Sequence, residues 1–183
     1  MKIIHFLTLI LLGATMACTN DTKTNSSNTE LPNLIKSDSL GFALQVPKNW
    51  EVQPNTGRPD LVGIFETFQD STDKFKENIQ IWREEIPMPI PDSMYYQAAM
   101  TQIRIANPDL TIQMSQPIII DSLKFRGFEF QFSTTDSAKY KVIGYTLLKG
   151  KYGYNLTCTA EQSKETIYLP LFNKILHSFK LRP

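Results

Sequence analysis

Residues 140–160 read YKVIGYTLLKGKYGYNLTCTA, in which apolar and polar side chains alternate on both sides of Lys149-Gly150-Lys151. Such alternation is typical of β-strands with one face in a core. A short turn that contains glycine is typical of a hairpin. The stretch therefore predicts two long antiparallel strands lying side by side, with Tyr154, Leu156, Cys158 and Ala160 on one face of the second strand.

Similar alternation recurs along most of the chain from Leu40 onward. It predicts further strands at residues 42–46, 62–68, 79–83, 110–114 and 123–132. Asp121-Ser122 predicts a second hairpin turn, just before the last of these strands. At least seven strands are therefore expected, and the hairpin turns between them favour an antiparallel sheet.

The segment that follows residue 91 changes to helical spacing. Asp92-Ser93 predicts an N-cap, and Tyr95, Ala99 and Ile103 recur every four residues. Asn107-Pro108 then predicts the end of the helix, because the residue before proline is disfavoured in the helical region.

A second helix is expected near the C-terminus, where Tyr168, Phe172 and Phe179 form an apolar stripe. Pro170 must lie in the first turn of this helix or kink it, so the regular part of the helix is predicted to begin near Tyr168. Together the elements predict an α+β fold: an antiparallel sheet of about six to seven strands with helices packed on it.

The first eighteen residues have the layout of a secretory signal. Lys2 gives a positive start, residues 3–12 are an apolar run, and residues 13–17 lead to Cys18 through small side chains. The run is too short to span a membrane. The Ala17-Cys18 junction resembles the lipobox of bacterial lipoproteins, which predicts a signal peptide over residues 1–17 and an acyl (palmitate-type) lipid on Cys18. Ordinary cleavage after Ala17 would instead give a soluble secreted protein.

Residues 18–37 are polar up to Glu30, lack aromatic side chains and offer little to bury, so they predict a disordered tether ahead of a globular domain at residues 38–183. The formal net charge of the whole chain is +1, and it becomes 0 when residues 1–17, with their single charge on Lys2, are removed. A neutral chain without a basic stripe is not expected to bind nucleic acid.

The globular part resembles the PsbP-like superfamily, which includes DcrB-type bacterial lipoproteins. The resemblance lies in FALQVPKNW (residues 42–50), in YGYNLTCTA (152–160) and in YLPLF (168–172) followed by Ser178-Phe179-Lys180. It implies an α/β/α sandwich around an antiparallel sheet. Members of the superfamily are mostly binding proteins without a shared catalytic motif, so the resemblance transfers no catalytic or ligand residue to this chain.

The residues themselves offer little for catalysis. Cys158 lies on the apolar face of its strand, which favours a buried thiol over a nucleophile. His177 is the single histidine after the signal peptide, and neither a Gly-x-Ser-x-Gly motif nor zinc-ligand spacing is present. We therefore expect no catalytic residues, no metal and no cofactor. Trp50 is expected to pack in the core.

Acidic residues gather at Asp60, Glu66, Asp70 and Asp73, and again at Glu84-Glu85. Oxygen atoms between Asp70 and Asp73 would suit a weakly bound calcium ion. A solvated turn between two strands is the simpler interpretation, because the glycine and the glutamate of a calcium loop are missing.

The segment IPMPIP at residues 86–91 has three prolines at alternate positions. They stiffen an extended loop. If Met88 and Ile90 are exposed, they would form an apolar partner-binding site that loses little conformational entropy when a partner binds. Alternatively, both side chains fold back onto the core.

Five aspartates precede a serine and then an apolar or small residue, at residues 38, 70, 92, 121 and 136. The pattern resembles an O-glycosylation acceptor of some bacterial envelope proteins. Asp-Ser is also the natural pair for turns and helix caps, and both interpretations remain open.

These observations favour a lipid-anchored, exported, non-enzymatic binding or assembly module of the bacterial cell envelope, engaging an unidentified envelope protein. It would face the periplasm or the cell surface, and Thr19 after Cys18 is compatible with the outer membrane. One alternative is a carrier or sensor for a small apolar molecule held between the sheet and the helix at residues 95–103. Another is a hydrolase with an unrecognised site.

Overall fold

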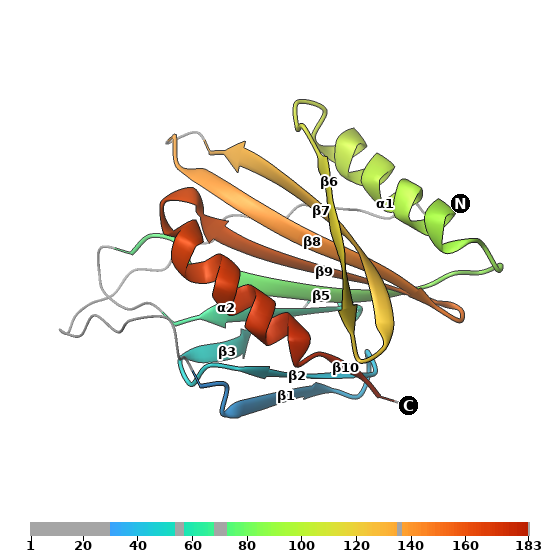
Figure 1. The fold of residues 1–183 in the computed structure, drawn as a ribbon, viewed down its shortest axis with the longest axis horizontal. Helices are drawn as coiled ribbons and strands as arrows, with labels where there is room; N and C mark the ends of the chain where they lie inside the picture. The colour runs from blue at the N-terminus through green and yellow to red at the C-terminus, as the bar shows by residue number, and fades with distance from the viewer. Residues whose placement is uncertain (1–29, 54–56, 68–72, 135–136, 183) are drawn as a thin grey trace.

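The computed structural model describes residues 30–53, 57–67, 73–134 and 137–182. Two antiparallel sheets and two main helices form the fold (Figure 1). The large sheet has seven strands in the order β3-β4-β5-β9-β8-β7-β6, and the small sheet has three in the order β1-β2-β10. The strands of the large sheet are β3 (Trp50–Gln53), β4 (Leu61–Glu66), β5 (Asn78–Glu85), β6 (Gln113–Ile120), β7 (Leu123–Ser133), β8 (Lys139–Lys149) and β9 (Tyr152–Glu161). The remaining elements are β1 (Asn33–Ser37), β2 (Phe42–Val46), β10 (Lys180–Leu181), α1 (Asp92–Ala106), the short 3₁₀ helix η2 (Gln162–Lys164) and α2 (Glu165–His177).

The β8–β9 hairpin lies near the middle of the large sheet, as the alternation of residues 140–160 predicts. Ile143 pairs with Cys158, and Lys149 pairs with Tyr152 at the closing turn. Gly150 in this turn has φ 61°, a left-handed conformation that glycine adopts without a steric cost. The second predicted turn is also confirmed, with Asp121 and Ser122 at φ 49° and 65°, values that fit the tight turns of two-residue hairpins.

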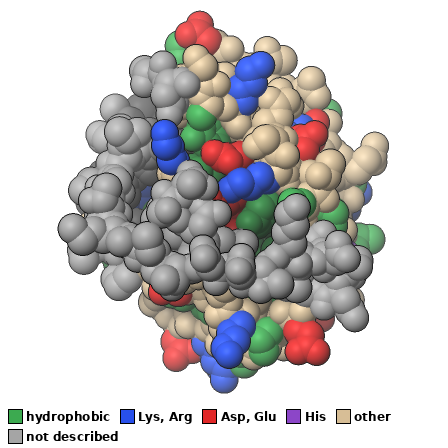
Figure 2. All heavy atoms as spheres, turned by 90° about the vertical axis from the view of Figure 1, so that its left-hand side faces the viewer, with side chains coloured by type: hydrophobic (Ala, Val, Ile, Leu, Met, Phe, Trp, Pro, Cys, Tyr) green, Lys and Arg blue, Asp and Glu red, His purple; other side chains and the backbone are tan. Residues whose placement is uncertain are grey.

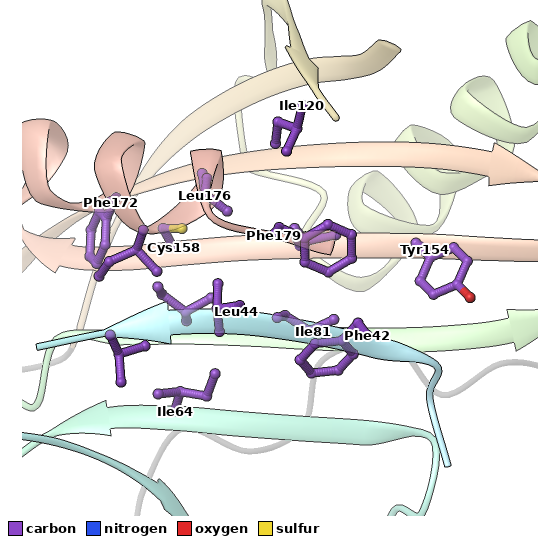
Figure 3. Close-up of a cluster of buried hydrophobic side chains, with 14 of the residues drawn as sticks. Phe42, Leu44, Ile64, Ile81, Ile120, Tyr154, Cys158, Phe172, Leu176 and Phe179 are labelled. Atoms are coloured by element: carbon purple, nitrogen blue, oxygen red, sulfur yellow. The ribbon is translucent and has the colours of Figure 1, made fainter. Parts of the chain in front are cut away.

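One face of the large sheet is covered by α2 and the small sheet, and the larger core lies between them (Figures 1 and 3). The side chains that fill it are fully or almost fully buried. They come from the sheet (Ile79, Ile81, Leu156, Cys158), from β2 (Phe42, Leu44, Val46) and from α2 and its end (Phe172, Ile175, Leu176, Phe179). This arrangement explains the apolar spacing of the C-terminal helix.

The opposite face carries α1 over a second, smaller apolar cluster. Tyr96, Met100 and Ile103 of α1 pack against Phe128 and Phe130 of β7 and against Val142 of β8. Neighbouring residues on a strand point to opposite faces, so Val142 and Ile143 serve the two different cores. Helices thus lie on both sides of the sheet, and the α+β sandwich is confirmed.

The chain enters the domain earlier than the sequence predicts. Residues 33–37, assigned to the tether, form β1 and pair with all five residues of β2. The boundary at residue 37 is therefore wrong. The physical reason is that Leu31 and Ile35 pack partly buried against the main core, and Asn33 Nδ2 donates to Pro47 O at 3.3 Å.

Both helix starts also differ from expectation. Pro91, not Asp92, occupies the N-cap of α1, and no side chain caps it; Asp92 instead pairs with Arg126 of β7. α2 begins at Glu165 with Pro170 inside it, three residues earlier than predicted. A proline removes one helical hydrogen bond, and the burial of Phe172 and its neighbours holds the helix together across that gap.

Two strands of the large sheet were misplaced or missed. The strand expected at residues 110–114 runs from Gln113 to Ile120, with a register shift between Ser115 and Ile118. Pro117 is tolerated there because β6 is an edge strand and proline lacks a backbone donor. β3, which begins at Trp50, has only four residues and was missed.

Candidate interaction site

The proline-rich loop at residues 86–91 joins β5 to α1 at the right-hand end of the sheet in Figure 1. Its first residue is fixed, because Ile86 N donates to Lys151 O in the β8–β9 turn at 2.7 Å. The side chain of Met88 is 65% exposed, whereas Ile90 is half-buried. Of the two predicted partner-binding residues, Met88 therefore projects into solvent, and Ile90 is only partly accessible.

A cluster of hydrogen-bonded polar side chains from β5, β9 and α1 lies next to the loop. Tyr95 OH donates to Glu84 Oε1 at 2.9 Å, and Asn155 Nδ2 donates to the same tyrosine oxygen. Burial raises the pKa of Glu84 and of Tyr95. Because Tyr95 and Asn155 are buried and Glu84 is half-buried, their mutual hydrogen bonds fix the first turn of α1 and with it the end of the loop.

The first strand, β1, begins at the other end of the sheet. β1 is antiparallel to β2, with Asn33 opposite Val46. The turn between them lies beside the end of β5, since Arg83 Nη2 donates to Ser39 O at 2.6 Å. Asn33 is therefore at the end of the sheet where β5 begins, opposite to Met88.

The two residues considered for nucleophilic catalysis do not form a site. Cys158 is 0% exposed in the main core, and burial raises the pKa of its thiol (Figure 3). His177 is exposed at the end of α2, where its Nδ1 lies 2.7 Å from the Asn173 carbonyl oxygen of the same helix. A hydrolase therefore has no support from these side chains. Trp50 packs edge-on against Phe172, with ring centroids 6.0 Å apart.

The predicted acidic group is divided by the fold. Asp60 pairs with Arg58 at 2.8 Å, which lowers its pKa through a side-chain hydrogen bond. Glu66 is buried and accepts hydrogen bonds from Asn49 and Tyr168, while Asp73 binds Lys164 at 3.0 Å. Among the residues that the structure describes, no group of three or more His, Cys, Asp or Glu side chains is placed to hold a metal ion.

Glu77 and Lys164 were missed by the sequence analysis, although they join Asp73 and Glu161 in one charged cluster. Glu77 lies in an irregular segment before β5 and Lys164 in a 3₁₀ turn, so no periodic pattern marks either residue. Figure 2 looks onto this end of the molecule, where acidic and basic side chains lie next to one another.

The space beneath α1, where a carrier would hold its ligand, is occupied by aromatic rings. A Cβ added to Gly153 would lie 2.3 Å from the ring of Tyr95, and one added to Gly144 would lie 2.1 Å from the ring of Phe128. An open depression of about 400 Å³ lies elsewhere, lined by Ala138, Lys139, Glu161, Gln162 and Ser163. A ligand carrier therefore gains no support here.

The Asp-Ser pairs that the structure describes lie at turns or helix starts. Ser39, Ser93 and Ser122 are exposed, as is Ser137 with φ 66°. Asp70, Ser71 and Asp136 lie outside the described residues, as do Cys18 and the whole predicted signal peptide. Across the described ranges, neither helix has the length and apolar character needed to cross a bilayer.

No protein-family model matches the chain, and no curated protein matches its sequence. Solved structures do match. Cyanobacterial PsbP (CyanoP) from Synechocystis superposes with a TM-score of 0.61 at 12% identity, covering 87% of this chain and 98% of that one. LpqN of Mycobacterium tuberculosis, described as involved in cell envelope biogenesis, superposes with a TM-score of 0.62 at 17% identity, covering 82% of this chain and 90% of LpqN. PA94 of Pseudomonas aeruginosa, described as a protein of unknown function and putative regulator, superposes with a TM-score of 0.52 at 13% identity, covering 82% of this chain and 97% of PA94. The chain therefore has the PsbP-like fold.

Proposed function

We propose that this protein is a lipid-anchored, exported binding or assembly module of the bacterial cell envelope. It acts by contact and not by catalysis, and its partner is an envelope protein that binds the loop around Met88. The observation that carries the proposal is the position of this loop: an exposed methionine at the end of the sheet opposite the start of β1.

The physical properties of the loop support a contact role. Pro87, Pro89 and Pro91 restrict the backbone, and Ile86 and Tyr95 fix its two ends. A surface that is ordered before binding loses less conformational entropy when a partner docks. Methionine adapts to irregular partner surfaces because its side chain is unbranched and polarisable. Met94, 56% exposed on the first turn of α1, extends the apolar character of this end.

The comparisons support the proposal at the level of architecture. The PsbP-like fold occurs in LpqN, whose description names cell envelope biogenesis. Because one fold hosts many functions, the role of this chain depends on its own loop and on the predicted lipid at Cys18. Both can be tested directly.

We expect Met88→Ser to lower the recovery of the partner at least tenfold when the full-length protein is purified from its native envelope. A central apolar contact typically accounts for about 2 kcal/mol of binding free energy or more. Met114→Ser is the matched control, because Met114 is also highly exposed (76%) but lies on β6. Quantitative mass spectrometry of the co-purified proteins measures the effect. Equal recovery with both variants would contradict the proposed surface, and both variants should retain wild-type stability to within about 0.5 kcal/mol.

We expect Cys18→Ala to move the protein from the membrane fraction to the soluble fraction. Stable anchoring needs the acyl chains, and the described part of the chain offers no helix that spans a membrane. Cys158→Ala is the control, because it removes the other cysteine and should leave the protein in the membrane fraction. Intact mass spectrometry of the wild-type protein should show cleavage before Cys18 and added acyl mass. A soluble wild-type protein with an unmodified Cys18 would rule out the anchor, and further hexose-sized increments would reveal glycans on the Asp-Ser serines.

A further inference from the structure

The charged cluster at the end of the sheet opposite Met88 has a buried glutamate, Glu77, at its centre. Glu77 is 0% exposed and lies immediately before β5. Its Oε1 is 3.5 Å from Lys164 Nζ and accepts a hydrogen bond of 3.4 Å from the backbone N–H of Glu161. Its Oε2 is buried and has no hydrogen-bond partner in the described part of the chain. A buried carboxylate with an unsatisfied oxygen is costly in its charged form.

Within the described residues, Glu77 and two further acids surround one lysine. Lys164 Nζ lies 3.0 Å from Asp73 Oδ1 and 3.4 Å from Glu161 Oε2, in addition to its contact with Glu77. One ammonium group thus faces three carboxyl groups. Burial opposes the charge on Lys164, but the hydrogen bond to Asp73 and the charges of the three acids outweigh it and raise the lysine pKa. Lys164 therefore stays protonated, and any proton taken up by the cluster goes to a carboxyl group.

Glu77 is the carboxyl group best placed to take that proton. Its pKa is raised from 4.5 to about 7: burial is the main cause, the charge of Lys164 partly opposes the increase, and the charge of Asp73 adds a smaller upward contribution. Deeper in the same region, the hydrogen bond between Tyr168 and Glu66 links the first turns of α2 to β4. Glu66 N in turn donates to Glu77 O at 2.9 Å, so Glu77 is connected to this second pair through the backbone.

We propose that Asp73, Glu77, Glu161 and Lys164 form a proton-operated clasp that fastens the start of α2 to the chain entering β5. The clasp joins three parts of the fold: the segment before β5, the end of β9, and the 3₁₀ turn that leads into α2. Acidification neutralises Glu77 and removes its repulsion from Asp73, which leaves Lys164 shared by Asp73 and Glu161. The clasp is therefore tighter at pH 6 than at pH 8.

The sign of the effect follows from linkage. Because the pKa of Glu77 is higher in the folded chain than its ordinary value, the folded state holds more protons between pH 4.5 and 7. The contribution of Glu77 to the free energy of unfolding is therefore fully present below pH 4.5 and is lost as the pH rises through 7. Between pH 6 and 8 the unfolding equilibrium constant should increase about tenfold through Glu77 alone.

The test compares urea unfolding at pH 6 and pH 8 for the wild-type protein, Glu77→Gln and Glu85→Gln. We expect Glu77→Gln to remove the tenfold increase. Glu85→Gln should keep it, because Glu85 is exposed and pairs with Lys151 at the opposite end of the sheet. An unchanged pH dependence in Glu77→Gln would overturn the proposal.

A second measurement does not depend on how Glu77→Gln folds. Carboxyl ¹³C NMR of the wild-type protein should show Glu77 titrating near pH 7, and Lys164→Met should move that midpoint upward because the neutralising charge is gone. A wild-type midpoint near the ordinary value of 4.5, or one that Lys164→Met leaves in place, would overturn the clasp.

Discussion

Phe172→Ala should lower the free energy of unfolding by about 3–5 kcal/mol, the range typical of phenylalanine truncation in a packed core. Phe172 is 0% exposed on the buried side of α2 (Figure 3). Its ring centroid lies 6.0 Å from those of both Trp50 and Tyr168. Removing the ring loses apolar burial and leaves a cavity at the point where α2 meets β3. Urea unfolding followed by far-UV circular dichroism measures the loss.

Ile167→Ala is the control on the same helix. Ile167 is 46% exposed, so its truncation should change stability by about 0.5 kcal/mol or less. Equal losses for the two variants would mean that α2 does not close the main core. That result would also remove the basis for placing Lys164 and Tyr168 against the sheet.

The features that could be predicted from sequence are those encoded in local periodicity. The β6–β7 turn is marked by the residue types Asp121-Ser122, and the β8–β9 hairpin and the two helices are marked by spacings of two or about four residues. Such patterns depend on burial of one face, and each of these elements has one face in a core. The fold class followed from them.

Features that depend on distant partners could not be predicted. β1 and β10 are short, and each is defined by its pairing with β2. Lys164 and Asp73 lie 91 residues apart in sequence, so nothing near either residue predicts their contact. Likewise, the three prolines indicate a stiff loop at residues 86–91, but only the fold determines that Met88 faces solvent while Ile90 is half-buried.

The reason for a glycine at position 144, within β8, could not be predicted from the sequence. Gly144 lies in the middle of β8 and is paired with Phe128 on one side and Thr157 on the other. By intrinsic preference a glycine weakens a strand, and a β-branched residue should strengthen it. The structure shows the opposite requirement, because the ring of Phe128 covers Gly144 and fills the space where a side chain would be.

Gly144→Val should therefore destabilise the protein, by about 3 kcal/mol or more, at the upper end of the range for overpacked cores. Its Cβ would lie 2.1–2.6 Å from three carbons of the Phe128 ring, which is 1% exposed beneath α1. Because this ring packs in the same apolar cluster as Met100 and Ile103 of α1, hydrogen exchange in α1 should accelerate more than in α2. Gly57→Val is the control, since a Cβ at that position meets nothing within 4 Å, and it should have little effect.

A double-mutant cycle tests the steric cause directly. Combined with Phe128→Ala, Gly144→Val should cost much less than it does in the wild-type background, with a coupling energy of about 2 kcal/mol in the rescuing direction. Additive losses of unfolding free energy would show that the valine disturbs β8 itself and not the packing of α1 on Phe128. In that case the buried cluster of Tyr95, Glu84 and Asn155 would be the main attachment of the helix. The orientation of the Met88 loop would then depend on those three hydrogen-bonded side chains more than on the aromatic packing beneath Met100.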